Sequence, residues 1–407
     1  MGWGKGVEMV AVVTQEQSRM RYPAVRYVGS TTEVQIAYFP GSGGIDEYHL
    51  IVRPTAYADF ATQARWVREA YQEACAQFAL TCDTGVFHRF FCSDLPNQAP
   101  LITTEFREME ASSAVSWVSQ PPAPPAKIAL WAYHVQTPGA TLVKRKEGAT
   151  LSLKRGELTH YWTTGLTCPE EDYSRQQTEH ILTRYEEDLQ ARGLTVADHV
   201  LRTWFFVQNV DANYQGLVTA RREFFADRGL TPDTHYIAST GIEGRSAQVA
   251  AKVMMDAYAV AGVRREQIHY LSAPDHLCPT HHYGVTFERG VSVTYADRKQ
   301  LFISGTASID RTGNILHPGD VRRQLARTLE NIAALLQQDG ATLADVGVFL
   351  VYLRDPSDFD LVQHLMAEHS HGAPVQIVLA PVCRPGWLIE VECAAVVPAV
   401  NALLPPF

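Results

Sequence analysis

The chain has 407 residues, of which 46% are hydrophobic and 19% are charged. It is therefore long enough for two to four domains, and its composition excludes a mostly disordered chain. Its 44 acidic residues outnumber the 35 basic ones, giving a net charge of −9, whereas nucleic-acid binding needs clustered lysines and arginines. No stretch approaches the roughly 18 apolar residues of a membrane span, so we expect neither nucleic acid nor a membrane as a partner.

The seven cysteines predict a reducing, cytoplasmic environment. Their number is odd and they include no C-x-x-C pair, so neither a disulfide framework nor a zinc ribbon is expected. His276, Cys278, His281 and His282 lie close together in the sequence, but Pro279 interrupts them and their spacing matches no zinc pattern. We predict reduced thiols, most of them buried, with no metal and no other cofactor.

Residues 1–120 predict a first unit of mixed helix and strand. Phe60–Phe78 can form a helix, and Val86–Phe91 then reads as a strand. The order of these elements matches that of the later units, although few residues do. A proline-rich segment follows at 120–125, and such a segment favours an extended conformation and cannot continue a helix. We therefore place the boundary of the first unit there.

A repeated pattern predicts two further units, at 127–262 and 279–399. The pattern G-x-T-x-A-D occurs at 193–198 and again at 340–345. Each copy follows an amphipathic helix and precedes an apolar strand, and a second helix comes after that strand. The expected helices are 175–191, 214–227, 321–338 and 358–368, and the expected strands are 200–208 and 346–353.

The third unit carries the most recognisable motifs. An apolar strand at 301–308 ends in small residues, Pro374 precedes another strand, and a strand at 388–395 closes the unit. This succession resembles the Rid (YjgF-type) superfamily, whose members form homotrimers with sites in the clefts between subunits. The resemblance implies α+β units, each a mixed sheet backed by two helices, and three copies in one chain imply a pseudo-trimeric barrel. Both a monomer and a homo-oligomer of the chain are compatible with this arrangement.

Two branches of this superfamily compete. Imine and enamine deaminases carry an arginine shortly after the proline that matches Pro374, but here that place is taken by Gln376, whose neutral amide cannot replace a guanidinium fork. Chorismatases have tandem Rid-type units and a C-terminal stretch of the form C-R-x-x-L-L-V-E-I-E. The stretch Cys383–Glu392 reads C-R-P-G-W-L-I-E-V-E, and fragments at 202–204, 220–222 and 238–241 also resemble that branch.

Two glutamates of the last strand are candidates for acid chemistry. Residues two apart on a strand face the same side, so Glu390 and Glu392 share one face. Apolar surroundings and a neighbouring like charge both raise the pKa of a carboxyl group, and a neutral glutamic acid near pH 7 is a usable general acid. The resemblance implies that Glu390 is this acid. Alternatively, both glutamates point to solvent or pair with arginines.

The resemblance to chorismatases implies a hydrolase or lyase that removes pyruvate from chorismate or a related cyclic carboxylate. The product would be a dihydroxycyclohexadiene carboxylate or a hydroxybenzoate. Chorismate is a dianion and needs fixed cations, for which Arg384 and Arg221 match family positions. A Rid-type imine or enamine deaminase and a non-catalytic small-molecule binder remain as alternatives. The other residues expected around the substrate are Cys383, Tyr283, Gly241 and Glu392.

Overall fold

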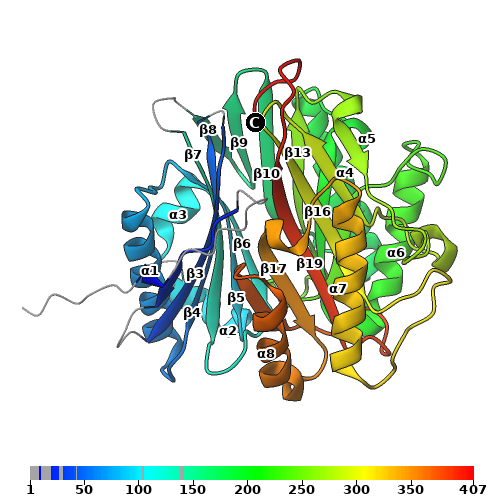
Figure 1. Cartoon of the computed structure of the whole chain (residues 1–407). Coiled ribbons are helices and arrows are strands. Elements are labelled where there is room, and N and C mark those ends of the chain that lie inside the picture. Colours follow the sequence, from blue (N-terminus) through cyan, green and yellow to red (C-terminus); the bar gives the residue numbers. More distant parts are fainter. Residues whose placement is uncertain (1–8, 11–19, 27–30, 43, 103–104, 138–141) are drawn as a thin grey trace, which may run out of the picture.

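A computed structural model describes residues 9–10, 20–26, 31–42, 44–102, 105–137 and 142–407. Three mixed β-sheets surround a common axis, and helices cover their outer faces (Figure 1). Helices α1 (Phe60–Gln77) and α3 (Arg107–Ser112) lie on one side of the molecule and α4 (Ser174–Ala191) and α6 (Val210–Ala226) on the opposite side. Helices α7 (Val321–Gln337) and α8 (Phe359–His369) lie in front in this view. This is the expected α+β architecture of three units around a pseudo-threefold axis.

The first sheet has seven strands in the order β1-β2-β3-β4-β7-β5-β6. Helix α1 begins at a capping residue, Asp59, whose carboxylate accepts a hydrogen bond of 2.8 Å from the backbone N–H of Thr62. The elements are β1 (Met9–Val10), β2 (Ala24–Arg26), β3 (Thr32–Pro40), β4 (Asp46–Pro54), α1 (Phe60–Gln77), β5 (Gly85–Cys92), α2 (Leu95–Ile102), α3 (Arg107–Ser112), β6 (Ala114–Ser119) and β7 (Ile128–Gln136).

The second sheet has six strands in the order β12-β11-β13-β10-β9-β8. Its two long helices, α4 and α6, contact each other on the outer face. The elements are β8 (Val143–Glu147), β9 (Thr150–Arg155), β10 (Leu158–Thr167), α4 (Ser174–Ala191), α5 (Val196–His199), β11 (Val200–Val207), α6 (Val210–Ala226), β12 (Ala238–Glu243) and β13 (Val253–Ala261).

The third sheet has six strands in the order β14-β15-β16-β19-β17-β18. The elements are η1 (Arg265–Gln267), β14 (Ile268–Tyr270), η2 (Thr280–Tyr283), β15 (Gly290–Thr294), β16 (Arg298–Ala307), α7 (Val321–Gln337), η3 (Leu343–Asp345), β17 (Val346–Leu353), η4 (Pro356–Asp358), α8 (Phe359–His369), β18 (Val375–Leu379) and β19 (Ile389–Pro398), where η denotes a 3₁₀ helix.

One five-strand core recurs in all three sheets. The cores are β3-β4-β7-β5-β6, β9-β10-β13-β11-β12 and β15-β16-β19-β17-β18. The strands β5, β11 and β17 are buried along their whole length, because helices cover one face and the neighbouring units cover the other. Each has a one-residue register shift near its start, between Gly85 and Phe87, Val200 and Arg202, and Val346 and Val348.

These shared bulges fix which residues are equivalent. The middle strands of the three cores are β7, β13 and β19. Counted from the bulges, Trp131 of β7, Asp256 of β13 and Glu392 of β19 occupy the same position, each paired with the equivalent residue of β5, β11 or β17. Two residues earlier in the same strands stand Ala129, Met254 and Glu390 in turn. One register therefore relates the three units, although few of their residues are identical.

Two expected boundaries were wrong. Strand β7 follows the proline-rich segment but pairs with β4 and β5, so it belongs to the first sheet rather than to a unit beginning at 127. The segment is not a linker between units, because the backbone N–H of Leu379 donates to the carbonyl of Pro121 and docks the segment on β18. The third sheet also begins earlier than 279, since β14 pairs with β15.

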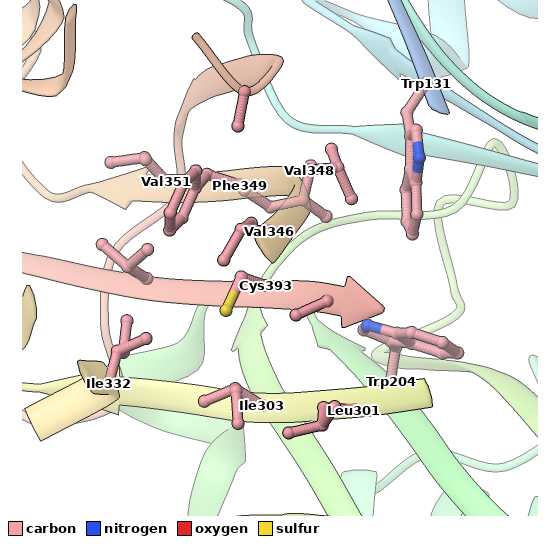
Figure 2. Packing of buried hydrophobic residues seen from close by; sticks show 14 of the residues in the cluster. Trp131, Trp204, Leu301, Ile303, Ile332, Val346, Val348, Phe349, Val351 and Cys393 are labelled. Carbon is pink, nitrogen blue, oxygen red and sulfur yellow. The ribbon is translucent and has the colours of Figure 1, made fainter. Parts of the chain in front are cut away.

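The units close around the axis through strand contacts. Strand β6 contacts β10, β12 contacts β16, and β17 contacts β3 and β4. The largest apolar core spans all three units. In Figure 2, Trp131 of the first unit and Trp204 of the second approach Val348 and Cys393 of the third. Because neighbouring units share this close-packed core, the walls of any cleft between two units have a rigid support.

Candidate active site

A pocket lies in the cleft between the second and third units. It encloses about 530 Å³ including its open mouth. The second unit contributes α6 and β12, and the third contributes the segment before β15, strand β16 and the residues leading into β19. The lining residues are Tyr214, Arg221, Ser239, Thr240, Gly241, Tyr283, Val285, Phe287, Arg289, Gly305, Ala307, Ile309, Cys383, Arg384, Trp387 and Glu390.

Glu390 is the single carboxyl group in this lining. Its side chain is only 6% exposed, and among the described residues none donates a hydrogen bond to it. Burial raises its pKa to about 8, and the nearby charge of Glu392 adds to the shift. Gly305 lies against the carboxyl in a bulge of β16, where a Cβ atom would clash with it. The bulge therefore makes room for a carboxyl group that is protonated at neutral pH.

Three arginines provide the positive charge of the pocket. Arg221 of α6 is buried, and its Nη1 donates to the Ser239 hydroxyl at 3.2 Å, while its Nε and Nη2 are buried without a hydrogen-bond partner among the described residues. Arg289 donates from Nη2 to the Cys278 carbonyl at 3.0 Å, and its Nε is likewise unpartnered. Buried guanidinium donors without partners are costly, so they point to an anionic ligand that would satisfy them.

The third arginine is held by aromatic rings. Arg384 lies 4.6 Å from the ring centre of Tyr283 and 5.0 Å from that of Trp387. Tyr283 also stacks with Arg289 at 5.4 Å, so one tyrosine contacts two of the three guanidinium groups. These contacts fix planar cations and aromatic faces at the mouth of the pocket, where they suit an unsaturated carboxylate.

Cys383 lies beside the acid. Burial raises the pKa of its thiol to about 12, and the charge of Glu390 adds to that effect. A thiol in this state is not a nucleophile at neutral pH, because the thiolate is the reactive form. Its place in the lining therefore fits a contact with substrate rather than covalent catalysis.

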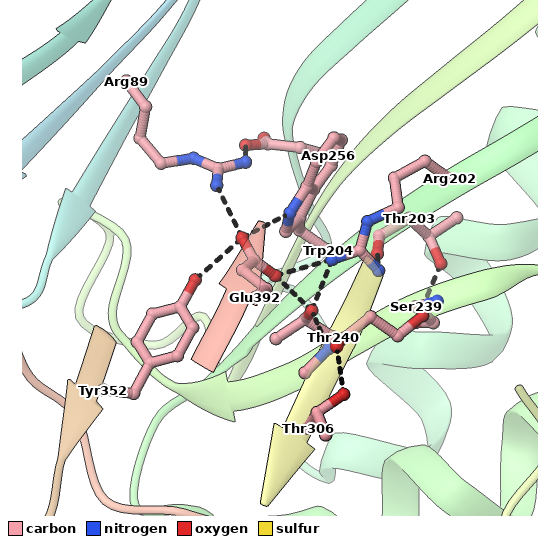
Figure 3. Close-up of polar contacts among 12 residues, drawn as sticks. Arg89, Arg202, Thr203, Trp204, Ser239, Thr240, Asp256, Thr306, Tyr352 and Glu392 are labelled. Carbon is pink, nitrogen blue, oxygen red and sulfur yellow. Dashed lines mark hydrogen bonds and ion pairs between the residues drawn. The ribbon is translucent and has the colours of Figure 1, made fainter. Parts of the chain in front are cut away.

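Glu392 is not part of the pocket lining, and its carboxylate contacts side chains of the three units (Figure 3). Its carboxylate accepts hydrogen bonds from Arg202 at 2.6 Å, from the Trp204 indole at 2.9 Å and from Tyr352 at 3.1 Å. The Thr240 hydroxyl also donates to it, and Arg89 of the first unit stands 4.0 Å away. This glutamate is therefore fully partnered by side chains from all three units.

The buried positive and negative charges around Glu392 are equal in number. Arg89 pairs with Asp256 at 2.9 Å, and Asp256 also accepts a hydrogen bond from the Gly165 backbone. With Arg202 and Glu392, the cluster holds two buried cations and two buried anions. Thr240 links it to the pocket, because its hydroxyl accepts from the Gly305 backbone N–H at 2.9 Å.

The structure brings together all but one of the residues expected at the site. Glu390, Arg384, Arg221, Cys383, Tyr283 and Gly241 line the pocket, and Glu392 does not. Sequence reasoning missed Arg289, Tyr214, Phe287 and Trp387. An arginine directly before the first strand of this region is a weak signal for Arg289.

Two further observations concern partners. In the part of the chain that the structure describes, no group of three or more histidine, cysteine or acidic side chains is arranged to hold a metal ion. None of the described helices combines the length and the apolarity needed to cross a bilayer.

Comparison with known proteins agrees with this architecture. A family model described as Endoribonuclease L-PSP matches residues 289–397. A RutC family protein of Pyrococcus abyssi is 36% identical over 98 residues, which are 23% of this chain and 76% of the relative. A RutC family protein of Pyrococcus horikoshii is 38% identical over 98 residues, covering 23% of this chain and 77% of the relative. The chain belongs to the RutC, or Rid, family.

A solved structure extends the likeness beyond the third unit. A chorismatase superposes with a TM-score of 0.59 at 19% identity, over 77% of this chain and 93% of that chain. At this identity the match shows a shared fold. This Rid protein therefore has the tandem, chorismatase-like arrangement of units that its C-terminal motifs indicated.

The shared register also gives the positions equivalent to Gln376, the residue that stands where a deaminase arginine was expected from the sequence. Gln376 of β18 is equivalent to Thr240 of β12 and Ser116 of β6, because each pairs with corresponding residues of the adjacent strand. None of the three is an arginine. The guanidinium groups of the pocket come instead from α6, from the segment before β15 and from the loop before β19.

Proposed function

We propose that this Rid protein is a chorismatase-like enzyme that removes pyruvate from chorismate or a closely related cyclic enolpyruvyl carboxylate. The observation that carries the proposal is a buried carboxyl group with a raised pKa that lines the same pocket as three arginines. Only the third unit has a carboxyl at this position, since the equivalent residues are Met254 and Ala129. The solved chorismatase of the same fold supports the choice of substrate.

The chemistry follows from the protonation states. Glu390 donates its proton to the methylene carbon of the enolpyruvyl ether, which leaves an oxocarbenium ion at the neighbouring carbon. Water adds to that carbon, and the resulting hemiketal collapses to pyruvate and the ring alcohol. The carboxylate left on Glu390 then regains a proton from the added water, so that one water is consumed per pyruvate released.

The arginines bind the charges that do not react. A dianionic substrate gains donors from Arg221 Nε and Nη2 and from Arg289 Nε, which are buried without a hydrogen-bond partner among the described residues. Substrate carboxylates held by these cations place the enolpyruvyl group near Glu390, while the aromatic side chains around Arg384 exclude water from the ring. The hydroxyl and thiol groups of Tyr283 and Cys383 remain available to orient the ring.

The test measures pyruvate release from chorismate by a coupled assay. Wild type and the surface control Glu330→Gln should release pyruvate, whereas Glu390→Gln should not. Glu330 is suitable because its side chain is 62% exposed on α7. Unchanged turnover in Glu390→Gln would refute the assignment of the acid. Ammonia release from an amino-acid-derived imine, with no pyruvate from chorismate, would favour the deaminase alternative.

A further inference from the structure

Thr240 joins the charges around Glu392 to the wall of the candidate active site. A hydroxyl group has one proton to donate and two lone pairs that accept. The Thr240 hydroxyl uses all three. It donates to the Glu392 carboxylate and accepts from Arg202 Nη2 (Figure 3). It also accepts from the Gly305 backbone N–H at 2.9 Å. Thr240 is buried, so a group that loses its bond to this hydroxyl has no bulk water to replace it.

Gly305 is the residue of the bulge that meets the acid. A Cβ atom at this position would clash with Oε1 of Glu390, so the Glu390 carboxyl packs against the Gly305 backbone. None of the described residues donates a hydrogen bond to that carboxyl. The direction in which the Gly305 N–H points therefore affects both the packing of the acid and its hydrogen bonding.

The second unit contains the same bulge in another form. Gly165 of β10 occupies the place of Gly305, because both bulges interrupt the pairing with the middle strand at the same position. Gly165 has a φ of +70°, a left-handed value that Gly305 does not adopt. Its N–H donates to the carboxylate of Asp256, the equivalent of Glu392, at 2.8 Å. In this form the glycine therefore bonds to a carboxylate directly, without a hydroxyl between them.

The hydroxyl that faces each glycine also differs. Ser116 of β6 is the equivalent of Thr240. Its hydroxyl is buried without a hydrogen-bond partner among the described residues, so it does not accept from the Gly165 N–H. The bulge thus has the left-handed form beside a hydroxyl that does not accept from the glycine, and the other form beside Thr240, which does.

We propose that Thr240 is a positioning residue for the acid, whose hydroxyl holds the Gly305 bulge in the form that packs against the Glu390 carboxyl and leaves this carboxyl without a donor. The inference rests on the proposed function only in taking Glu390 as the acid.

The consequence of losing the hydroxyl has the same sign by two routes. Once released, the Gly305 N–H can turn to Glu390 and stabilise its ionised form directly. Alternatively it turns to Glu392, as in the second unit. That requires the left-handed form, in which the Cβ side of Gly165 has no neighbour within 4 Å among the described residues, so the acid loses its packing. Either change favours the ionised form of Glu390.

Several ionisable groups line the pocket with Glu390 or act on its charge. Thr240 carries no charge, so changing it removes none of them, and an altered ionisation in a Thr240 variant would report the bulge. These groups are Glu392 of β19, Arg202 of β11, Tyr214 and Arg221 of α6, Tyr283 and Arg289 of the segment before β15, and Cys383 and Arg384 of the loop before β19.

The test compares Thr240→Val with Thr240→Ser in the full-length chain. Valine keeps the shape of the side chain without the hydroxyl, and serine keeps the hydroxyl. Infrared difference spectra recorded without substrate follow the carboxyl band that Glu390→Gln lacks. Its ionisation midpoint should fall by about one pH unit in Thr240→Val, as expected for one hydrogen bond to a charged group, and should stay at the wild-type value in Thr240→Ser. An unchanged midpoint in Thr240→Val, an equal fall in both variants, or absence of the band from wild type would overturn the proposal.

Tyr352→Phe is the matched control. It removes another hydroxyl donor from Glu392, at 3.1 Å, but leaves the bond between Thr240 and Gly305. Its midpoint should equal that of wild type, and a fall as large as in Thr240→Val would overturn the proposal by showing that the effect passes through Glu392. Thr240→Ala also lacks the hydroxyl and adds no bulk, so it carries the same prediction if the valine variant does not fold.

Turnover gives a second readout. With a wild-type midpoint of about 8, a fall of one pH unit leaves about a fifth of the acid form at pH 8. At that pH the kcat for pyruvate release should therefore fall about fivefold in Thr240→Val with KM little changed, whereas at pH 6 the two proteins should differ little. A loss of equal size at both pH values would contradict the positioning role. Because the spectra need no chorismate, a wild type that releases no pyruvate would count against the proposed function alone.

Discussion

Two glutamates, two residues apart on β19, have opposite surroundings. Glu392 at the axis accepts hydrogen bonds from arginine, tryptophan, tyrosine and threonine side chains, and its charge is balanced. Glu390 in the cleft has no such donor among the described residues, and burial raises its pKa to about 8. The strand gives both the same face, and the neighbouring units decide the difference. Glu392 therefore joins side chains of the three units, whereas Glu390, the proposed acid, has no such partners.

Replacing the acid should have the largest effect on turnover. Glu390→Gln keeps the shape of the side chain but cannot donate the proton, so pyruvate release should fall by about 10²- to 10⁴-fold. Its unfolding free energy should not fall and should rise at neutral pH, because folding of the wild type must protonate a carboxyl that is ionised in the unfolded chain. Steady-state kinetics together with urea denaturation separate the two effects. A marked loss of stability in Glu390→Gln would show that Glu390 is structural.

Replacing Glu392 should affect the stability of the fold more than Glu390→Gln does. Glu392→Gln leaves Arg202 and Arg89 with one buried anion between them, and breaking a buried ion pair costs about 3–5 kcal/mol. The urea midpoint of Glu392→Gln should therefore fall well below that of Glu390→Gln. Equal midpoints for the two variants would contradict the assigned division between them.

Removing a pocket cation should trade stability against activity. Arg221→Met eliminates a buried guanidinium with two unpartnered nitrogens, so the unfolding free energy should rise by about 1 kcal/mol. The kcat/KM should fall by about 10- to 100-fold, because a charge-assisted contact with the substrate carboxylate is lost. A variant that is both less stable and fully active would show that Arg221 serves the fold.

The dependence on pH should be the most specific of these effects. Because the acid form of Glu390 reacts, turnover should decline as the pH rises through about 8. The raised pKa also makes Glu390 favour folding below its unfolded value of about 4.3, and this contribution is lost as the pH rises through about 8. Glu390→Gln should remove that part of the stability profile. An unchanged stability profile in this variant would contradict the raised pKa.

The local motifs could be predicted from the sequence, and the contacts across units could not. Cys383, Arg384 and Glu390 lie within one short stretch, so a single motif indicates all three. Whether Glu390 or Glu392 faces the cleft depends on Arg202 and other side chains of the second unit, which no local pattern places.

The boundary of the first unit could not be read locally for a similar reason. Proline-rich residues usually connect domains, but here the segment lies between two strands of one sheet and docks on β18. Only the pairing of β7 with β4 and β5 reveals that the strand after the segment completes the first unit. Strand pairing between distant residues is information that composition does not carry.

Direct observation of the Glu390 proton tests the account most closely. Infrared difference spectra of wild type, Glu390→Gln and Glu392→Gln, recorded from mildly acidic to alkaline pH, report protonated carboxyl groups. Wild type should show a protonated carboxyl at neutral pH that ionises near pH 8, and Glu390→Gln should lack it. Glu392→Gln should keep it but ionise at lower pH, because the neighbouring negative charge is gone. Absence of a protonated carboxyl in wild type at neutral pH would contradict the assignment of Glu390 as the general acid.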